Sequence, residues 1–195
     1  MLHACAVIFT EFLYRRCSLS DGYRDVYIYG SELFFSTSLS AISILLISIL
    51  MGRPISGILF ILIFAGLRIF VGGFHAATYK RCFLLTNGVF LITLGGSISL
   101  RNCNTLTSAM ILISSVCVIW TLAPIRNNHH PLSEKTYQKN KKIGRVLVIA
   151  EGMASIFTLL IGTNLAVLSI SVASITAVAM MMVAAKLAEG RGNYD

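Results

Sequence analysis

The chain has 195 residues, of which 56% are hydrophobic and 12% are charged, and its formal net charge is +8. Soluble domains typically carry about 25% charged residues, so this composition excludes an ordinary soluble domain and favours an integral membrane protein. The positive charge does not indicate nucleic-acid binding, because basic residues gather in the cytoplasmic loops of membrane proteins. We therefore predict the lipid bilayer as a partner, and no nucleic acid.

The first 30 residues mix apolar and charged positions. Phe9, Phe12 and Leu13 share one helical face, away from the charged side chains. This pattern is typical of an amphipathic helix that lies at the cytoplasmic membrane interface, and the stretch from Ser18 to Gly22 then ends it. No basic segment precedes the apolar residues, so we predict no cleavable signal peptide.

Six apolar stretches follow and predict an all-α, polytopic membrane protein. Segments inside a bilayer must satisfy their own backbone groups, and helices do so. Pro54 falls in the first turn of the second stretch, where proline is tolerated. We predict one membrane domain over 1–195, with an interfacial segment at 1–30, a six-helix region at 33–186 and a cytoplasmic tail at 187–195. The predicted spans are 33–51, 55–71, 83–100, 106–124, 145–163 and 166–186.

Basic residues are distributed unevenly around these spans. With the N-terminus in the cytoplasm, only Arg53 and Arg101 of the 16 Lys and Arg residues fall outside, which leaves 14 inside. This asymmetry predicts that both termini are cytoplasmic. It also makes 125–144 a basic cytoplasmic loop.

The five cysteines contain no CxxC pair and are odd in number, which argues against a disulfide framework or a zinc knuckle. His129-His130 offer a rival base or half of a metal site. No carboxylate or cysteine lies at ligand spacing from them, and we interpret them as residues of a solvated loop. No metal and no other cofactor is predicted.

A base and a thiol lie between the second and third spans, at His75 and Cys82. A thiol needs a nearby base or positive charge to become a nucleophile at neutral pH. In a straight helix these residues would be about 10 Å apart along the axis, beyond hydrogen-bond reach. Gly72-Gly73 breaks the helix just before His75, so 74–81 can fold back as a loop and bring the two side chains together.

The surroundings of Cys82 favour a thiolate. Lys80 and Arg81 directly precede it, and it lies near the N-terminus of the third span, where the helix dipole favours an anion. The same residues also fit ordinary basic anchors beside an inert interfacial cysteine. The residues alone leave both interpretations open.

The motif resembles the signature of the AgrB family, the accessory gene regulator B membrane peptidases of bacterial quorum sensing. The resemblance extends over essentially the whole chain, including its length, the six-span layout, the basic loop and an Ala-Pro pair at the end of the fourth span. The residues that carry it are Arg68-x4-Gly73-x-His75-Ala76-x5-Cys82.

The resemblance implies a cysteine endopeptidase of the bacterial cell membrane, a thiol protease that removes the C-terminal tail of a short AgrD-like propeptide. Carried over by position, Cys82 is the nucleophile and His75 the general base, with the site on the cytoplasmic side. Arg68 and Gly73 match positions that the family needs for activity. An acyl thioester on Cys82, attacked by an internal residue of the peptide, would give a lactone or thiolactone autoinducing peptide.

Two charged residues inside the spans are further site candidates. Arg68 can bind a carboxylate of the acidic substrate tail or snorkel to the headgroups. Glu151 lies within the fifth span, where an ionisable group is costly and indicates a site. Glu151 would orient His75 or bind substrate. Alternatively, it is a helix residue that is protonated or paired with Arg145.

Asn87 is a third, uncharged candidate. It would either orient His75 or form a hydrogen bond between helices.

A membrane exporter or transporter of a small peptide is the alternative function. Intramembrane charge is sparse, however, and the sequence lacks the broken apolar segments in matching halves that mark many transporters. Gly95-Gly96 and Ala173-x3-Ala177 permit close approach of helices. We interpret both as contacts within the chain, and a homodimer stays open.

Overall fold

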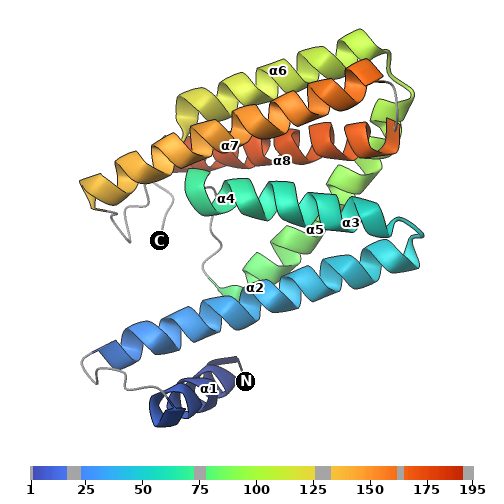
Figure 1. Cartoon of the computed structure of the whole chain (residues 1–195). Coiled ribbons are helices and arrows are strands. Elements are labelled where there is room, and N and C mark those ends of the chain that lie inside the picture. Colours follow the sequence, from blue (N-terminus) through green and yellow to red (C-terminus); the bar gives the residue numbers. More distant parts are fainter. Residues whose placement is uncertain (1, 17–22, 73–77, 126–132, 162–164, 191–195) are drawn as a thin grey trace.

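The computed structural model describes residues 2–16, 23–72, 78–125, 133–161 and 165–190, and these residues form helices joined by short connections (Figure 1). No strand occurs among them. The helices are α1 (Leu2–Arg16), α2 (Arg24–Leu50), α3 (Pro54–Phe60), the π-helical turn η2 (Ile61–Ala65), α4 (Gly66–Val71), α5 (Tyr79–Arg101), α6 (Thr105–Leu122), α7 (Glu134–Ile161) and α8 (Leu165–Gly190).

Six segments are long and apolar enough to cross a membrane: α2, the continuous α3–η2–α4 segment, α5, α6, α7 and α8. The predicted all-α, six-span architecture with a preceding N-terminal helix is therefore confirmed. The N-terminal ends of α2 and α7 lie at the same end of the bundle as the C-terminal ends of α4, α6 and α8 (Figure 1, left). This alternation is the one that the predicted topology requires.

Several predicted boundaries are wrong, because helices continue past the apolar residues. Helix α5 begins at Tyr79, before the predicted span 83–100, and α8 continues to Gly190, inside the predicted tail 187–195. The first spanning helix begins at Arg24, inside the predicted interfacial segment 1–30, and α7 begins at Glu134, inside the predicted loop 125–144. With 28 residues, α7 is about 42 Å long and exceeds a hydrocarbon core of about 30 Å. Its first turns are rich in Lys, Gln and Glu, which are good helix formers outside the bilayer.

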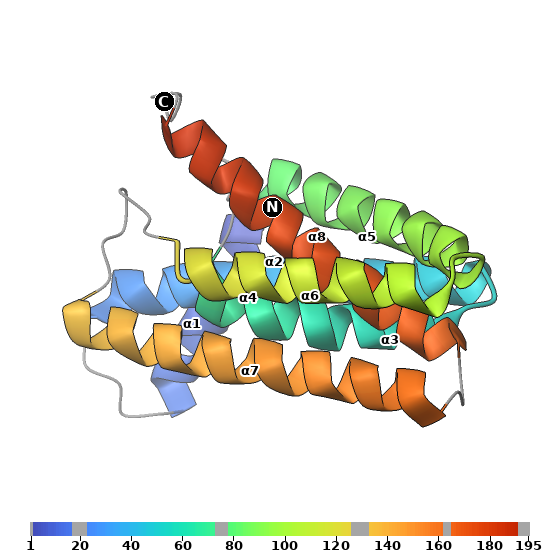
Figure 2. The same cartoon turned by 90° about the horizontal axis from the view of Figure 1, so that it is seen from above.

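Helix α8 forms the centre of the bundle and packs against α5, α6, α7 and α3 (Figures 1 and 2). Its buried face carries Ser169, Ser171 and Ser174. Each hydroxyl donates a hydrogen bond to a carbonyl three or four residues earlier in the same helix. These three serines of α8 therefore line the interior with their hydroxyls paired, and neighbouring helices approach closely.

The outer faces of the bundle are apolar. Leu46 of α2, Ile113 of α6 and Phe157 of α7 are all exposed, as are many other large hydrophobic side chains on these helices. A soluble protein rarely exposes so much contiguous apolar surface. Lipid contact over these faces accounts for the pattern.

Helix α1 lies along the N-terminal part of α2, away from the bundle centre (Figure 1). The Thr10 and Ser31 hydroxyls are 3.0 Å apart, and the rings of Phe9 and Phe35 meet edge to face with centroids 5.4 Å apart. Phe9 thus lies on the packed face of α1, as expected for the apolar side of an amphipathic helix.

The second span contains the π-helical turn η2 between α3 and α4. Pro54 occupies its first turn, as predicted. Phe60 stacks on Phe64 at 4.8 Å between ring centroids and approaches Phe90 of α5 at 5.1 Å. Single π-turns within helices occur often near functional sites, and this one lies just before Arg68.

Gly95-Gly96 does not mediate packing within the described chain, contrary to our interpretation. Both glycines are exposed, and a Cβ atom added to either one would meet nothing within 4 Å. The buried face of α5 is formed instead by Phe90, Leu94 and Ser97. Ala173, by contrast, is buried on α8, as the interpretation of the alanine pair requires.

The close contact between α2 and α3 at Gly57 gives a test of the fold. A Cβ atom on Gly57 would lie 2.6 Å from Cβ of buried Ser48, whereas one on Gly88 of α5 would meet nothing within 4 Å. A rotamer change cannot move the Ser48 Cβ, so Gly57→Ala should lower the free energy of unfolding by about 1–3 kcal/mol. Gly88→Ala is the control, with little expected change. Denaturant titration in detergent measures both, and equal stability of the two variants would contradict this packing.

Candidate active site

Cys82 lies half-buried in the first turn of α5. Its backbone N–H donates to the Thr78 carbonyl at 2.9 Å. The Thr78 side chain caps the helix by accepting from the Arg81 N–H at 3.3 Å. The prediction that Cys82 lies near the start of the third span is confirmed. The thiol therefore lies where the dipole of α5 favours an anion.

Positive charge surrounds this thiol. Lys80 and Arg81 are exposed on the same helical turn, and the guanidinium of Arg68 in α4 is close enough to the Cys82 thiol for the two groups to interact electrostatically. Arg68 is half-buried, and its guanidinium carbon lies 5.5 Å from the centroid of the Phe64 ring. The fold thus brings two predicted site residues from consecutive spans within electrostatic range of each other.

The chain leaves the second span at Gly72. Helix α4 ends at Val71, and Gly72 has φ +75° and ψ −159°, a conformation that is essentially confined to glycine. The Ile125 N–H donates to the Val71 carbonyl at 3.0 Å, and a Cβ atom on Gly72 would lie 3.3 Å from the Ile125 carbonyl oxygen. The predicted helix break is confirmed at this glycine.

Three predicted candidates lie outside the described residues: His75, Gly73 and the His129-His130 pair. The contact between His75 and Cys82 therefore stays a prediction. The loop predicted over 74–81 is partly wrong, because α5 already begins at Tyr79. The capping hydroxyl of Thr78 is what starts the helix there.

A hydrogen-bonded link between α1, α2 and α5 is a feature that sequence reasoning missed. The Tyr79 hydroxyl donates to Glu32 Oε2 at 2.8 Å, and Glu32 Oε1 lies 2.5 Å from Nδ1 of His3. Tyr79 is the first residue of α5, three positions before Cys82. An acidic residue inside a span signals a polar partner, but the predicted first span began at residue 33 and so excluded Glu32.

Glu151 is half-buried, and its Oε2 has no hydrogen-bond partner among the described residues. Pairing with Arg145 is not observed. Arg145 donates to the Trp120 carbonyl at 3.3 Å and lies over the Trp120 ring, 4.6 Å from its centroid. Six residues of helix rotate the chain by about 240°, so Arg145 and Glu151 lie on different faces of α7.

Asn87 connects two helices. Its Oδ1 accepts from the Ser43 hydroxyl of α2 at 2.8 Å, and its Nδ2 donates to the Phe83 carbonyl at 2.9 Å. The interpretation of Asn87 as an interhelical hydrogen-bond group is confirmed. Its amide helps to fix α5, and hence Cys82, against α2.

The fold and this site define a polytopic helical membrane protein with a thiol and several cations gathered at the ends of two spans. The sequence matches the family model for AgrB, described as Accessory gene regulator B, over residues 6–184. The chain therefore belongs to the accessory gene regulator B family, a family of cysteine protease-like membrane proteins associated with the processing of quorum-sensing propeptides. No curated protein and no solved structure matches the chain.

The link from Glu32 to Tyr79 predicts a change in the reactivity of Cys82. Tyr79→Phe removes one charge-assisted hydrogen bond from the first turn of α5, which should then open more often. We expect alkylation of Cys82 by a maleimide to become about threefold to tenfold faster, measured in protein whose other cysteines are serine.

Glu11→Gln is the matched control for this measurement. Glu11 pairs with Arg24 at 3.2 Å, and this exposed pair also joins α1 to α2 but does not contact α5. The alkylation rate should therefore be unchanged. A Tyr79→Phe rate no faster than that of Glu11→Gln would show that the link does not hold the first turn.

Proposed function

We propose that this protein is a membrane-embedded cysteine endopeptidase that removes the C-terminal tail of a short quorum-sensing propeptide. The position of Cys82 in the first turn of α5, within electrostatic range of the guanidinium of Arg68, is the observation that carries the proposal. Family membership supports the choice of substrate. The break at Gly72 supports a turn of the chain that returns His75 toward Cys82.

The reaction begins with transfer of the Cys82 thiol proton to His75. The thiolate attacks the carbonyl carbon of the scissile peptide bond, and the C–N bond of the resulting tetrahedral intermediate breaks. His75 returns its proton to the departing amine of the tail. The N-terminal part of the propeptide remains as an acyl thioester on Cys82.

Cyclisation completes the reaction. An internal thiol or hydroxyl of the bound peptide loses its proton to His75 and attacks the thioester carbonyl. The bond between carbonyl carbon and Sγ breaks, which releases a thiolactone or lactone, and the Cys82 thiolate recovers its proton from His75. A site at the lipid edge limits water, the competing nucleophile.

The start of α5 supplies donors for the developing oxyanion. The N–H groups of the first helical residues lack acceptors within the helix, and those of Tyr79 and Lys80 are in this position. The Cys82 N–H, by contrast, is already bonded to the Thr78 carbonyl. We assign oxyanion stabilisation to the first two N–H groups of the helix.

Arg68 is proposed to bind a carboxylate of the acidic tail. It is half-buried at the end of the second span and lies close to Cys82. A guanidinium with two parallel donors suits a carboxylate and would fix the scissile bond over the thiol. The excess of basic residues at this end of the bundle supports a cytoplasmic site.

Removal of either proposed catalytic group should abolish processing. We expect Cys82→Ala and His75→Ala each to reduce the rate of propeptide cleavage by at least about a hundredfold, because one removes the nucleophile and the other its base. Mass spectrometry of the propeptide after incubation with protein in nanodiscs measures this rate. Cys103→Ala is the control, because Cys103 is exposed just beyond the opposite end of α5. Normal cleavage by either catalytic variant would defeat the proposal.

The proposed role of Arg68 predicts a dependence on substrate charge. Arg68→Gln should lower kcat/KM for the natural propeptide by roughly tenfold to a hundredfold, the value of a hydrogen-bonded charge. The loss should be small for a propeptide whose tail carboxylates are replaced by amides. Arg53→Gln, at the other end of the same span, is the control. An equal loss on both substrates would assign Arg68 to folding instead.

A further inference from the structure

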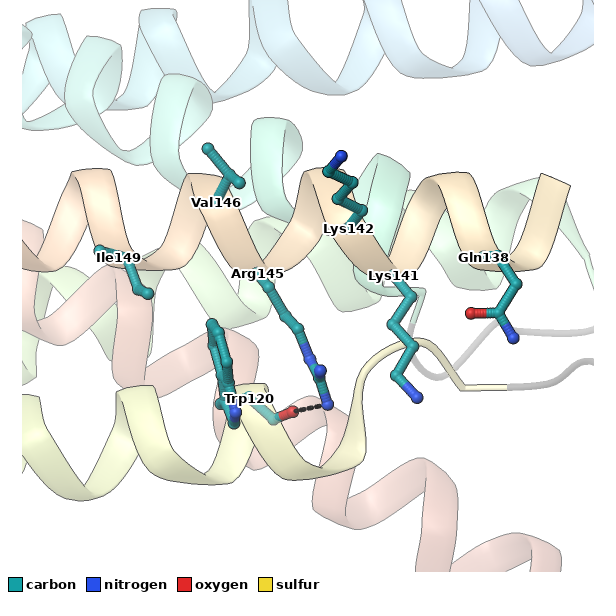
Figure 3. A pocket seen from close by; sticks show the side chains of 7 residues that line it. All are labelled: Trp120, Gln138, Lys141, Lys142, Arg145, Val146 and Ile149. Atoms are coloured by element: carbon teal, nitrogen blue, oxygen red, sulfur yellow. Dashed lines mark hydrogen bonds between the residues drawn. The ribbon is translucent and has the colours of Figure 1, made fainter. Parts of the chain in front are cut away.

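A groove of about 360 Å³ lies between the C-terminal end of α6 and the N-terminal half of α7 (Figure 3), and Cys82 is not among the residues that line it. One wall is formed by Trp120 of α6, and the other by polar and apolar side chains of α7. Gln138, Lys141 and Arg145 lie on the side of α7 that faces Trp120, whereas Lys142 and Val146 lie on its other side.

The groove changes in character along α7. Gln138 and Lys141 come first, Arg145 follows, and Ile149 lies at the far end. These positions span about 17 Å of helix at 1.5 Å per residue. The polar end belongs to the part of α7 that exceeds the bilayer core, and the apolar end lies where the helix enters it. The groove is therefore polar at one end and apolar at the other, as is a membrane lipid.

Arg145 is held at the boundary between these two ends. Its guanidinium carbon lies 4.6 Å from the centroid of the Trp120 ring, and Nη2 donates to the Trp120 carbonyl at 3.3 Å. A guanidinium carries five N–H donors, so this bond fixes its orientation and leaves others for a ligand. Tryptophan and arginine at this depth are typical of the headgroup region.

The positive charge in the groove is not neutralised by the described chain. Neither of the two ion pairs among the described residues includes Lys141, Lys142 or Arg145. The carboxylate of Glu134 lies two turns before Lys141 and accepts a hydrogen bond from the Gln138 side chain at 2.8 Å. The groove therefore suits an anion whose other end is apolar.

We propose that this groove binds an anionic glycerophospholipid. Lys141 and Arg145 hold the phosphate, and an acyl chain runs along Trp120 and Ile149. A free anion would gain nothing from the apolar end. The groove is also separate from the contact of α7 with α4, the helix that carries Arg68, because that contact is made at Gly144, which does not line the groove. The bound lipid joins α6 to α7 and stabilises their contact.

Fluorescence quenching tests this proposal directly, because Trp120 is the single tryptophan of the chain. The full chain is placed in phosphatidylcholine nanodiscs that contain a minor fraction of brominated lipid, either phosphatidylglycerol or phosphatidylcholine. We expect brominated phosphatidylglycerol to quench Trp120 at concentrations at least about fivefold lower, because each basic residue at the surface favours an anionic lipid. Equal quenching by the two brominated lipids would overturn the proposal.

Two double variants separate a built site from general surface charge. Lys141→Gln with Arg145→Gln should abolish the preference for phosphatidylglycerol. Lys135→Gln with Lys139→Gln removes the same charge from exposed positions of α7 outside the groove, and the preference should persist. An equal loss in both pairs would overturn the proposal. If the Lys141→Gln, Arg145→Gln protein does not fold, Lys141→Gln alone takes its place, because it leaves the contact of Arg145 with Trp120 intact. This single variant should weaken the preference for phosphatidylglycerol.

Competition identifies the source of the anion. Inorganic phosphate and a peptide with the acidic propeptide tail are each added to nanodiscs that contain brominated phosphatidylglycerol. We expect neither to restore Trp120 fluorescence. Recovery with phosphate would reveal a site for free anions, and recovery with the peptide a substrate site, and either would overturn the assignment to lipid. Cys82→Ala protein should give the same quenching, so the result is independent of the proposed peptidase activity.

Discussion

The bilayer offers no hydrogen-bond partners to a polypeptide backbone, and this constraint organises the whole molecule. Every crossing segment must be a helix, so unpaired N–H groups, glycine breaks and ionisable side chains gather where helices end. Cys82 lies at such an end, in a turn that is capped by Thr78 and approached by Arg68 from the preceding span. The proposed chemistry uses what the helix end already supplies: free backbone donors, a favourable dipole and partial shelter from water.

The interior of the bundle complements this arrangement. Serine hydroxyls on α8 bond to their own helix and let neighbouring helices approach. Large apolar side chains fill the interior around them, such as Phe60 and Phe90, and further apolar side chains cover the outer faces. Among the polar contacts between helices in the described residues, two bear on the proposed nucleophile. Asn87 joins α5 to α2, and Glu32 holds Tyr79 at the first residue of α5. Both fix the helix that carries Cys82, so stability and the position of the thiol depend on the same contacts.

Local features of the sequence were sufficient to predict the six spans, the first-turn role of Pro54 and the helix break at Gly72, because each follows from hydropathy or backbone geometry. Helix ends outside the bilayer were misplaced, since the turns after Glu134 are polar and carry no hydropathy signal. The link from Glu32 to Tyr79 joins residues 47 positions apart, and no local pattern encodes it. The interpretation of Gly95-Gly96 as a packing contact was wrong for a related reason. Small residues permit close packing, but only the fold decides whether another helix lies beside them.

In the proposed mechanism, Cys82 carries the N-terminal part of the peptide as a thioester. The most direct measurement is mass spectrometry of the protein after brief incubation with propeptide in nanodiscs and quenching in acid. We expect the fragment containing Cys82 to gain the mass of the N-terminal part of the propeptide. Hydroxylamine should remove this added mass, and the free tail should appear in equal amount. Unmodified Cys82 with intact propeptide in folded protein, or tail release with the adduct on another residue, would contradict this mechanism.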